Sequence, residues 1–194
     1  MCDGIVIDAH MIPAIRDELV RHSGSLYELI CWVIENCGIA RTPKIENHWR
    51  SKFSANRDHV FWKWYMNQVL NKAIHNIPPK NLSSSVKKKI RDDYGLSDPT
   101  VMEYIKCAYA TNEPRYILAE DMYFYDPRER RAASATQIEI KESRQGRLCK
   151  YLEEQLHIRV GTPADCKSHF SIDQSPCSDK NEVRIDQRQC SKLP

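Results

Sequence analysis

The sequence has no uninterrupted apolar run that approaches the roughly 20 residues of a membrane-spanning helix. Its start, Met1-Cys2-Asp3-Gly4, also lacks the basic residues and the apolar stretch of a secretory signal peptide. We therefore expect a cytoplasmic protein without membrane association. The 194 residues, of which 41% are hydrophobic, are sufficient for one domain with a substantial core and a short extension.

Paired cysteines are absent as well. The chain has eight cysteines, at positions 2, 31, 37, 107, 149, 166, 177 and 190, but no Cys-x-x-Cys pair. A structural zinc site needs closely spaced ligand pairs, and disulfides are rare in the cytosol. We therefore expect reduced, mostly buried thiols that do not reveal the function.

The motifs of several enzyme classes are also missing. There is no glycine-rich phosphate loop and no serine or cysteine nucleophile beside a histidine motif, which argues against nucleotide binding and acyl transfer. An aspartate-nucleophile phosphatase also begins with a strand that ends in aspartate, but it needs a second aspartate two residues later. In this chain His10 follows Asp8 at that distance, so this class is disfavoured too.

The charge of the chain is mild. A net charge of +3 is too small to indicate nucleic-acid binding by itself. Basic residues nevertheless gather in three clusters, which are Lys87-Lys88-Lys89 with Arg91, Arg128 with Arg130 and Arg131, and Lys141 with Arg144 and Arg147. Each cluster is typical of a solvated helix face and is alternatively a surface that holds a nucleic-acid backbone.

Apolar runs and helical periodicity alternate along the chain. The first run, Gly4-Ile5-Val6-Ile7, is apolar on both faces, which is typical of a buried parallel strand, and it ends at Asp8. Further short runs predict strands at residues 39–41, 116–119 and 157–160. Helical spacing predicts helices at residues 12–20, 26–34, 43–53, 60–74, 83–94, 98–109 and 148–156. Residues 122–147 are interpreted as a turn and a basic loop.

This alternation predicts an α/β fold in which helices cover both faces of a central, mainly parallel sheet, which is a three-layer α/β/α arrangement. We expect one domain at residues 1–166. Residues 167–194 are polar, lack periodicity and contain few apolar residues, which predicts a flexible tail.

Three aspartates are expected to converge at one edge of this sheet. Asp8 and Asp121 follow two predicted strands, and ligands of such sheets bind beyond the carboxyl ends of the strands. Asp98, at the start of a predicted helix, can approach from the side. Close carboxylates raise one another's pKa unless a cation neutralises them, which favours Mg²⁺ or Mn²⁺ held by these three residues. Taken singly, Asp98 is better explained as a helix cap, Asp8 as the end of a strand and Asp121 as the start of a turn, and it is their combination that favours a shared metal site.

The three acidic segments resemble motifs of the PIN-domain family in order, spacing and context. They are Ile5-Val6-Ile7-Asp8, Leu96-Ser97-Asp98-Pro99, and Tyr116-Ile117-Leu118-Ala119-Glu120-Asp121. The similarity spans about residues 4 to 166. It implies a PIN-like fold and a metal-dependent endoribonuclease, with Asp8, Asp98 and Asp121 as metal ligands and catalytic residues. Many bacterial relatives of this size are toxins of toxin-antitoxin pairs, which implies an antitoxin partner and a homodimer.

The sequence departs from the family at one further acidic position, on the helix after the second strand. The family motif has a Ser or Thr helix cap and an acidic residue just before an aromatic residue. With Thr42 as the cap and Trp49 as the aromatic residue, His48 stands at the acidic position. Glu46 lies two residues earlier, about 200° around the helix. The sequence leaves open whether His48, Glu46 or neither serves the site.

The pair Ala9-His10 is a second departure, because the family often has a small polar residue after the first aspartate. Two functions are therefore predicted. The first is a metal-dependent endoribonuclease that hydrolyses RNA phosphodiester bonds. The alternative is a catalytically weakened PIN-like module that binds RNA or a protein partner.

Overall fold

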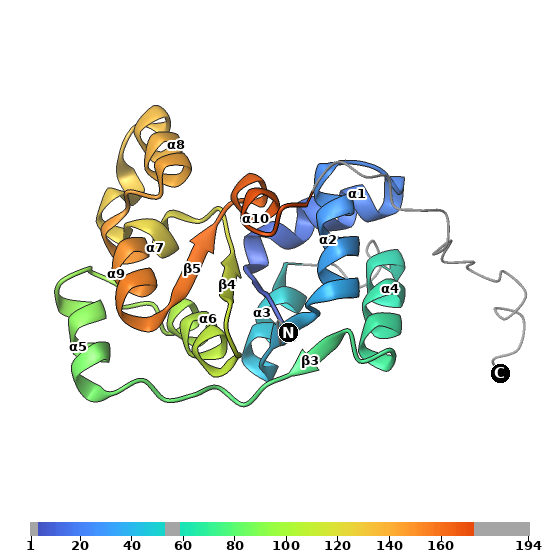
Figure 1. The fold of residues 1–194 in the computed structure, drawn as a ribbon, viewed down its shortest axis with the longest axis horizontal. Coiled ribbons are helices and arrows are strands. Elements are labelled where there is room, and N and C mark those ends of the chain that lie inside the picture. The colour runs from blue at the N-terminus through green and yellow to red at the C-terminus, as the bar shows by residue number, and fades with distance from the viewer. Residues whose placement is uncertain (1–3, 53–58, 173–194) are drawn as a thin grey trace, which may run out of the picture.

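A computed structural model describes residues 4–52 and 59–172 of the chain, which form a mixed α/β fold (Figure 1). Its strands are short and pair in parallel. They are β1 (Val6–Ile7), β2 (Ile39–Arg41), β3 (Ile74–Asn76), β4 (Arg115–Leu118) and β5 (Ile158–Gly161). The mixed α/β class with parallel strands is therefore confirmed, whereas the PIN-like three-layer architecture stays a prediction.

The strands form a three-stranded sheet, β1-β4-β5, and a two-stranded sheet, β2-β3. A parallel bridge between Ile5 and Ile39 joins the two sheets. Ile5 N donates to Gly38 O at 3.0 Å, and Ala40 N donates to Ile5 O at 3.0 Å. The order across the joined sheets is thus β3-β2-β1-β4-β5. From β1 the chain continues to β2 and β3 on one side of the sheet, and from β4 it continues to β5 on the other side. A topological switch point, where such folds bind ligands, therefore lies between β1 and β4.

Helices connect and cover these strands. They are α1 (Ile12–Arg21), α2 (Ser25–Asn36), α3 (Pro43–Ser51), α4 (His59–Leu70), α5 (Ser84–Asp92), α6 (Pro99–Ala110), α7 (Met122–Tyr125), α8 (Ser134–Ser143), α9 (Arg147–Leu156) and α10 (Pro163–His169), with 3-10 turns η1 (Ala9–Met11) and η2 (Pro127–Arg131). Helix α6 contacts β1, β2, β4 and β5 and packs beside α3. The strands β1 and β4 are fully buried except at Arg115, as their apolar composition predicts.

One predicted helix is corrected by the structure. The sequence predicts a helix from residue 60 to residue 74, but α4 ends at Leu70 and Ile74 begins β3. Ile74 pairs with Ile39 of β2, and Lys72 has a left-handed φ of 60° that ends the helical path. Pairing with β2 outweighs helical propensity here, which a local pattern cannot reveal. Phe53, assigned to the preceding helix, lies outside the described residues.

The loop predicted at residues 122–147 is also wrong, because it contains α7, η2 and α8. Side-chain caps start the first two elements: Tyr123 N donates to Asp121 Oδ1 at 3.0 Å, and Arg128 N donates to Asp126 Oδ1 at 3.2 Å. Helix α8 has no buried residue, so its sequence carries no amphipathic signal.

The predicted domain end after residue 166 falls inside α10. Thr162 and Asp165 form a capping box at the start of this helix, and Cys166 is fully buried. Beyond the helix, the Phe170 ring lies 5.2 Å from that of Trp32 in α2. The folded part therefore continues past the predicted boundary, and residues 173–194 of the predicted tail lie outside the described residues.

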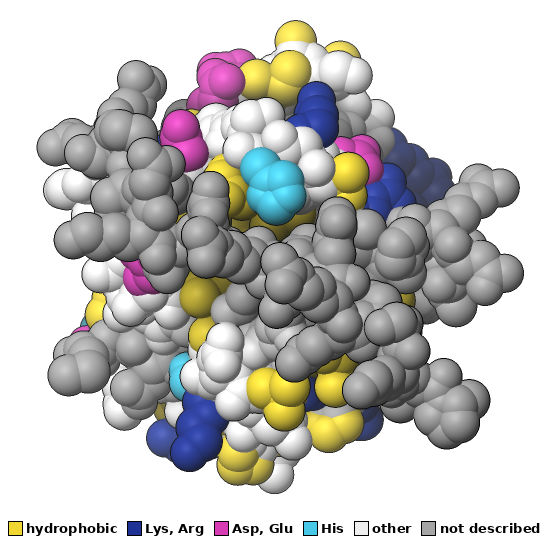
Figure 2. Space-filling model, turned by 90° about the vertical axis from the view of Figure 1, so that its right-hand side faces the viewer, with side chains coloured by type: hydrophobic (Ala, Val, Ile, Leu, Met, Phe, Trp, Pro, Cys, Tyr) yellow, Lys and Arg dark blue, Asp and Glu magenta, His cyan; other side chains and the backbone are white. Residues whose placement is uncertain are grey.

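Among the described residues, the large exposed hydrophobic side chains lie on three helices, and two of them share α4. They are Val20 on α1, Met66 and Leu70 on α4, and Ile138 on α8. Figure 2 shows hydrophobic, basic and acidic side chains interspersed on the described part of one face. Within residues 4–52 and 59–172, no helix has both the length and the apolar character needed to cross a membrane.

Trp49 joins α3 to the end of β1. Its indole Nε1 donates to the Ile7 carbonyl oxygen at 3.0 Å, and the side chain is 2% exposed. We predict that Trp49→Phe lowers the free energy of unfolding by about 1–3 kcal/mol, because a buried carbonyl loses its donor. Urea denaturation measures this loss. Trp64→Phe, on the half-buried face of α4, is the control, and equal losses in both variants would contradict the role of the hydrogen bond.

Candidate metal centre

Asp8 occupies the carboxyl end of β1. Its backbone N donates to Leu118 O at 2.9 Å, which extends the β1–β4 pairing by one residue and fixes Asp8 beside β4. The side chain is 2% exposed and caps η1, where Oδ2 accepts a hydrogen bond from His10 N at 3.3 Å. The carboxylate is thus buried at the switch point of the sheet.

Asp121 reaches the same edge from β4, three residues after the strand ends at Leu118. Its Oδ1 caps α7, which leaves Oδ2 directed at His10 at 3.3 Å from the ring Nδ1. The side chain is 20% exposed. Burial raises the pKa of the Asp121 carboxyl, and the negative charge of Asp8 raises it further. The sequence prediction that Asp8 and Asp121 lie together therefore agrees with the structure.

His10 lies between these two carboxylates. Its Nδ1 is 3.1 Å from Asp8 Oδ2 and 3.3 Å from Asp121 Oδ2. One ligand atom from each of Asp8, His10 and Asp121 fits within a mutual distance of 4.8 Å. The hydrogen bond to Asp8 raises the pKa of His10, the charges of Asp8 and Asp121 add to this, and partial burial and Lys52 oppose it.

His10 is the residue that sequence reasoning missed. In the sequence it stands out only as a departure from the PIN-domain motif and from the phosphatase motif. The available signal was the spacing Asp-x-His directly after a strand, because one turn of 3-10 helix returns the side chain of residue i+2 over the capping carboxylate. Recognising it required knowing that η1 starts at Ala9.

Asp98 lies near this cluster but outside it. It caps α6, with Oδ1 accepting from Thr100 N at 2.7 Å and from Val101 N at 3.4 Å. Among the described residues it does not join the group of ligand atoms formed by the other two aspartates and His10. Its charge still contributes to the raised pKa of Asp121 and partly offsets the lowered pKa of His48.

The structure separates the two alternatives for the missing carboxylate. Glu46 forms ion pairs with Arg41 and Arg50, the latter at 2.6 Å, so its charge is already balanced away from the cluster. The His48 ring lies 6.2 Å from the His10 ring, and its Nδ1 is 3.0 Å from Tyr104 Oη. Burial, assisted by Lys52, lowers the pKa of His48, so its imidazole is neutral near pH 7. His48 therefore borders the cluster, and Glu46 does not.

Other acidic residues near the motifs have structural partners. Glu103 is buried and accepts a hydrogen bond from Thr42 Oγ1 at 3.0 Å. Asp126 is buried and accepts from Arg128 N and Arg147 N, each at 3.2 Å. These contacts fit capping and packing roles.

Two cations border the cluster. Lys52 Nζ lies 3.5 Å from His10 Nε2, on the side of the ring opposite to the carboxylates. Arg130 acts on Asp121 by lowering its pKa, and its guanidinium carbon lies 4.7 Å from the centre of the Tyr123 ring. The arrangement combines two carboxylates and an imidazole, which suit a divalent metal ion, with positive charges that suit an anion beside it.

Comparison of the chain with protein-family models, curated proteins and solved structures finds no match. The PIN-domain family thus stays a resemblance carried by three short acidic motifs.

The raised pKa of His10 predicts a pH dependence of stability in metal-free protein. Protonated His10 stabilises the fold fully below its unfolded pKa of about 6.5, and this contribution is lost as pH rises through the higher folded pKa. We expect His10→Gln to lower the free energy of unfolding more at about pH 5.5 than at about pH 8.5. Urea denaturation in EDTA measures this, with the exposed His157→Gln as control. A loss that is independent of pH would contradict the ionic contact.

Proposed function

We propose that this protein is a metal-dependent endoribonuclease of PIN-like type that hydrolyses RNA phosphodiester bonds. The observation that carries the proposal is the convergence of Asp8 and Asp121, from the ends of β1 and β4, on one imidazole nitrogen at the switch point of the sheet. A divalent ion would be held by these two carboxylates, with His10 as a nitrogen ligand.

The energetics of the cluster support a cation there. Bringing two carboxylates together in a partly buried site is costly, and the raised pKa of Asp121 reflects that cost. Groups with perturbed pKa values in such an arrangement are candidates for function. A divalent ion held by Asp8 and Asp121 would offset the repulsion more fully than a proton on His10, because it would add two positive charges.

The donor set bears on the choice of ion. Carboxylates suit Mg²⁺ and Mn²⁺, whereas an imidazole ligand favours the transition metal of the two. We therefore propose Mn²⁺ as the preferred ion and Mg²⁺ as a weaker one. When bound, such an ion supplies a nucleophilic water at neutral pH and a clamp for a phosphodiester oxygen.

The residues of the chain then bind and orient the RNA. Lys52 beside His10, and Arg130 beside Asp121, provide positive charge for the phosphates that flank the scissile bond. Neutral His48 lies close enough to contact a phosphate or a water molecule at the edge of the cluster. Hydrolysis by water requires no covalent enzyme intermediate.

Three further elements of the proposal rest on the family resemblance. Asp98 is proposed as a third carboxylate of the site. Its Oδ1 caps α6, so it would act on the site by its negative charge and not as a ligand through that oxygen. A role as a toxin, with an antitoxin partner, is proposed from the habits of relatives of this size. Homodimer formation has the same basis.

A catalytically weakened binding module is the second candidate, and one observation favours it. His10 Nδ1 already lies within 3.1 and 3.3 Å of the two carboxylates, so a protonated imidazole neutralises part of their charge without any ion. In such a module the cluster is an internal ion pair and the surface binds RNA or a protein without cutting. Metal binding and cleavage separate the two candidates.

Cleavage of a mixed RNA pool tests the proposal. We expect the wild-type chain to cut with Mn²⁺, less with Mg²⁺, and not in EDTA. Asp8→Asn and Asp121→Asn should each lower the rate at least about 100-fold, since even partners of metal ligands typically matter 10–100-fold. His48→Ala should lower it less, because this ring only borders the cluster.

Glu46→Gln is the control for a charge change on α3, and it should cut at the wild-type rate within about threefold, because Glu46 is paired with Arg41 and Arg50 and offers no ligand atom to the cluster. Circular dichroism checks that each variant is folded. Absence of cutting with either ion, by folded wild-type protein, would overturn the nuclease and leave the binding module.

A further inference from the structure

A stack of cations and tyrosines joins α5 to α9 on the surface of the fold. The rings of Tyr94 and Tyr151 lie 4.9 Å apart, with 32° between their planes. Lys89 Nζ lies 5.2 Å from the centre of the Tyr151 ring, and Arg147 Cζ lies 5.9 Å from that of Tyr94. These four residues are called the cation–tyrosine stack below.

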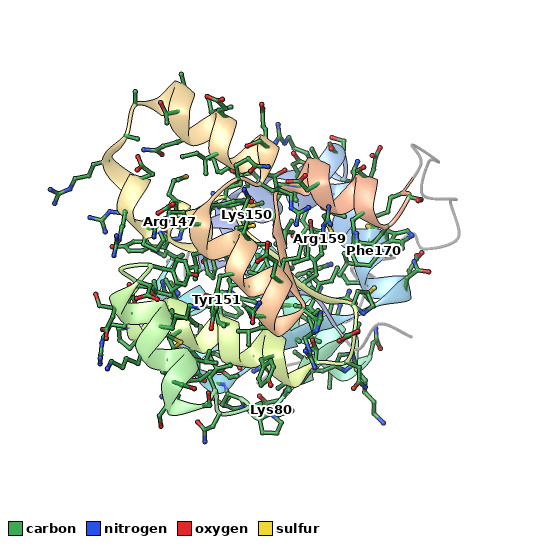
Figure 3. The ribbon with its side chains drawn as sticks, turned by 60° about the vertical axis from the view of Figure 1, so that its left-hand side comes forward. Lys80, Arg147, Lys150, Tyr151, Arg159 and Phe170 are labelled. Carbon is green, nitrogen blue, oxygen red and sulfur yellow. The ribbon has the colours of Figure 1, made fainter. Side chains whose placement is uncertain are left out.

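The two cations of the stack are exposed to solvent, and its two tyrosine rings are more deeply buried beneath them. Lys89 and Arg147 are exposed, and Tyr151 is only 7% exposed. Figure 3 labels Arg147, Lys150 and Tyr151 on α9, and the last two follow Arg147 by three and four residues, the spacings at which helical side chains are neighbours. Tyr151 is buried and Tyr94 is half-buried, so the stack offers mainly positive charge to a ligand.

The charge of this surface is only partly balanced by its neighbours. Burial raises the pKa of Tyr151, and the negative charge of Asp93 helps to raise it. Helices α5 and α9 carry six basic residues and three acidic ones. Asp92 is bound to Arg91 at 2.7 Å, and Glu153 forms ion pairs with Arg144 and Arg159. Among the residues that the structure describes, Lys89, Arg147 and Lys150 have no ion-pair partner, so their charges are available.

The stack restricts its cations before any ligand arrives. A long basic side chain loses conformational freedom when it binds a phosphate, and this loss weakens binding. Lys89 and Arg147 lie against aromatic rings, so part of that freedom is already lost in the folded protein. Two cations held in this way, with Lys150 beside them, match the repeated negative charge of a phosphodiester backbone.

We propose that the cation–tyrosine stack and Lys150 bind the phosphodiester backbone of RNA, without sequence preference, at a surface distinct from the Asp8–His10–Asp121 cluster. The choice of RNA rests on the proposed function, whereas the charge and exposure of the surface do not. The surface would hold the chain of a substrate whose other segment reaches the cluster.

Binding of a fluorescently labelled single-stranded RNA to the full chain, followed by anisotropy in EDTA, tests the proposal without cleavage. The double variant Lys89→Gln/Arg147→Gln removes two charges and keeps part of each side-chain stem over the rings. For single-stranded RNA, each lost phosphate contact reduces the slope of log K against log salt concentration by about 0.7. At 0.1 M salt this corresponds to about fivefold weaker binding per contact. We expect about 25-fold weaker binding for the double variant, which loses two such contacts.

Lys44→Gln/Lys63→Gln is the matched control, because both lysines are exposed on other helices and the net charge changes equally. It should weaken binding by less than about threefold, since only long-range charge is lost. Circular dichroism confirms that both double variants fold. Equal weakening by the two double variants, or no RNA binding by the wild type, would overturn the proposal.

Asp121→Asn separates this inference from the proposed nuclease. In EDTA it should bind RNA at least as tightly as the wild type, because it removes a negative charge away from the stack. If Asp121→Asn loses cleavage but still binds RNA, the stack remains a binding surface. If Lys89→Gln/Arg147→Gln cleaves and binds RNA as the wild type does, the stack proposal is refuted and the proposed nuclease is not.

Discussion

The parallel pairing of β1 with β4 is the constraint on which the rest of the site depends. Val6 pairs with Ile117 and Ile7 with Leu118, and the hydrogen bond from Asp8 N to Leu118 O continues this register. Because both strands run in the same direction, their carboxyl ends meet at one edge. Two carboxylates from segments more than 100 residues apart are therefore brought to one imidazole.

Placing the carboxylates together requires compensation, and the fold supplies it locally. The 3-10 turn η1 returns His10 to the Asp8 carboxylate that caps it, and α7 directs one oxygen of Asp121 to its own backbone and the other to His10. The structure thus contains a cluster that a proton can hold together. In the proposed nuclease a divalent ion would replace that proton, and this exchange would convert the ion pair into a metal centre.

Much of the fold follows from local sequence patterns. The run of β-branched residues before Asp8, the Thr42-Pro43 helix start and the Leu148–Leu156 spacing each predict the element that the structure contains. The pairing of Ile74 with Ile39 could not be read in this way, since a strand made by a distant partner overrides its own helical pattern. Helix α8, with no buried residue, leaves no periodic trace.

The site was predictable in its carboxylates and not in its imidazole. Asp8 and Asp121 follow from the rule that parallel strands end at a common edge. The position of the His10 side chain is set by the 3-10 turn that follows Asp8. The position of the Asp98 carboxylate is set by its role as the cap of α6. Residue spacing alone decides neither position. The same limit applies to Glu46, whose arginine partners Arg41 and Arg50 are apparent only in three dimensions.

The most direct test of the central claim is calorimetric titration of metal-free protein with Mn²⁺, comparing the wild type with Asp8→Asn, Asp121→Asn and the surface control Asp92→Asn. The account predicts one site per chain whose affinity falls at least about 100-fold in the first two variants and stays unchanged in the control. Binding of equal strength in all four proteins, or no binding by folded wild type, would contradict a metal centre at Asp8 and Asp121.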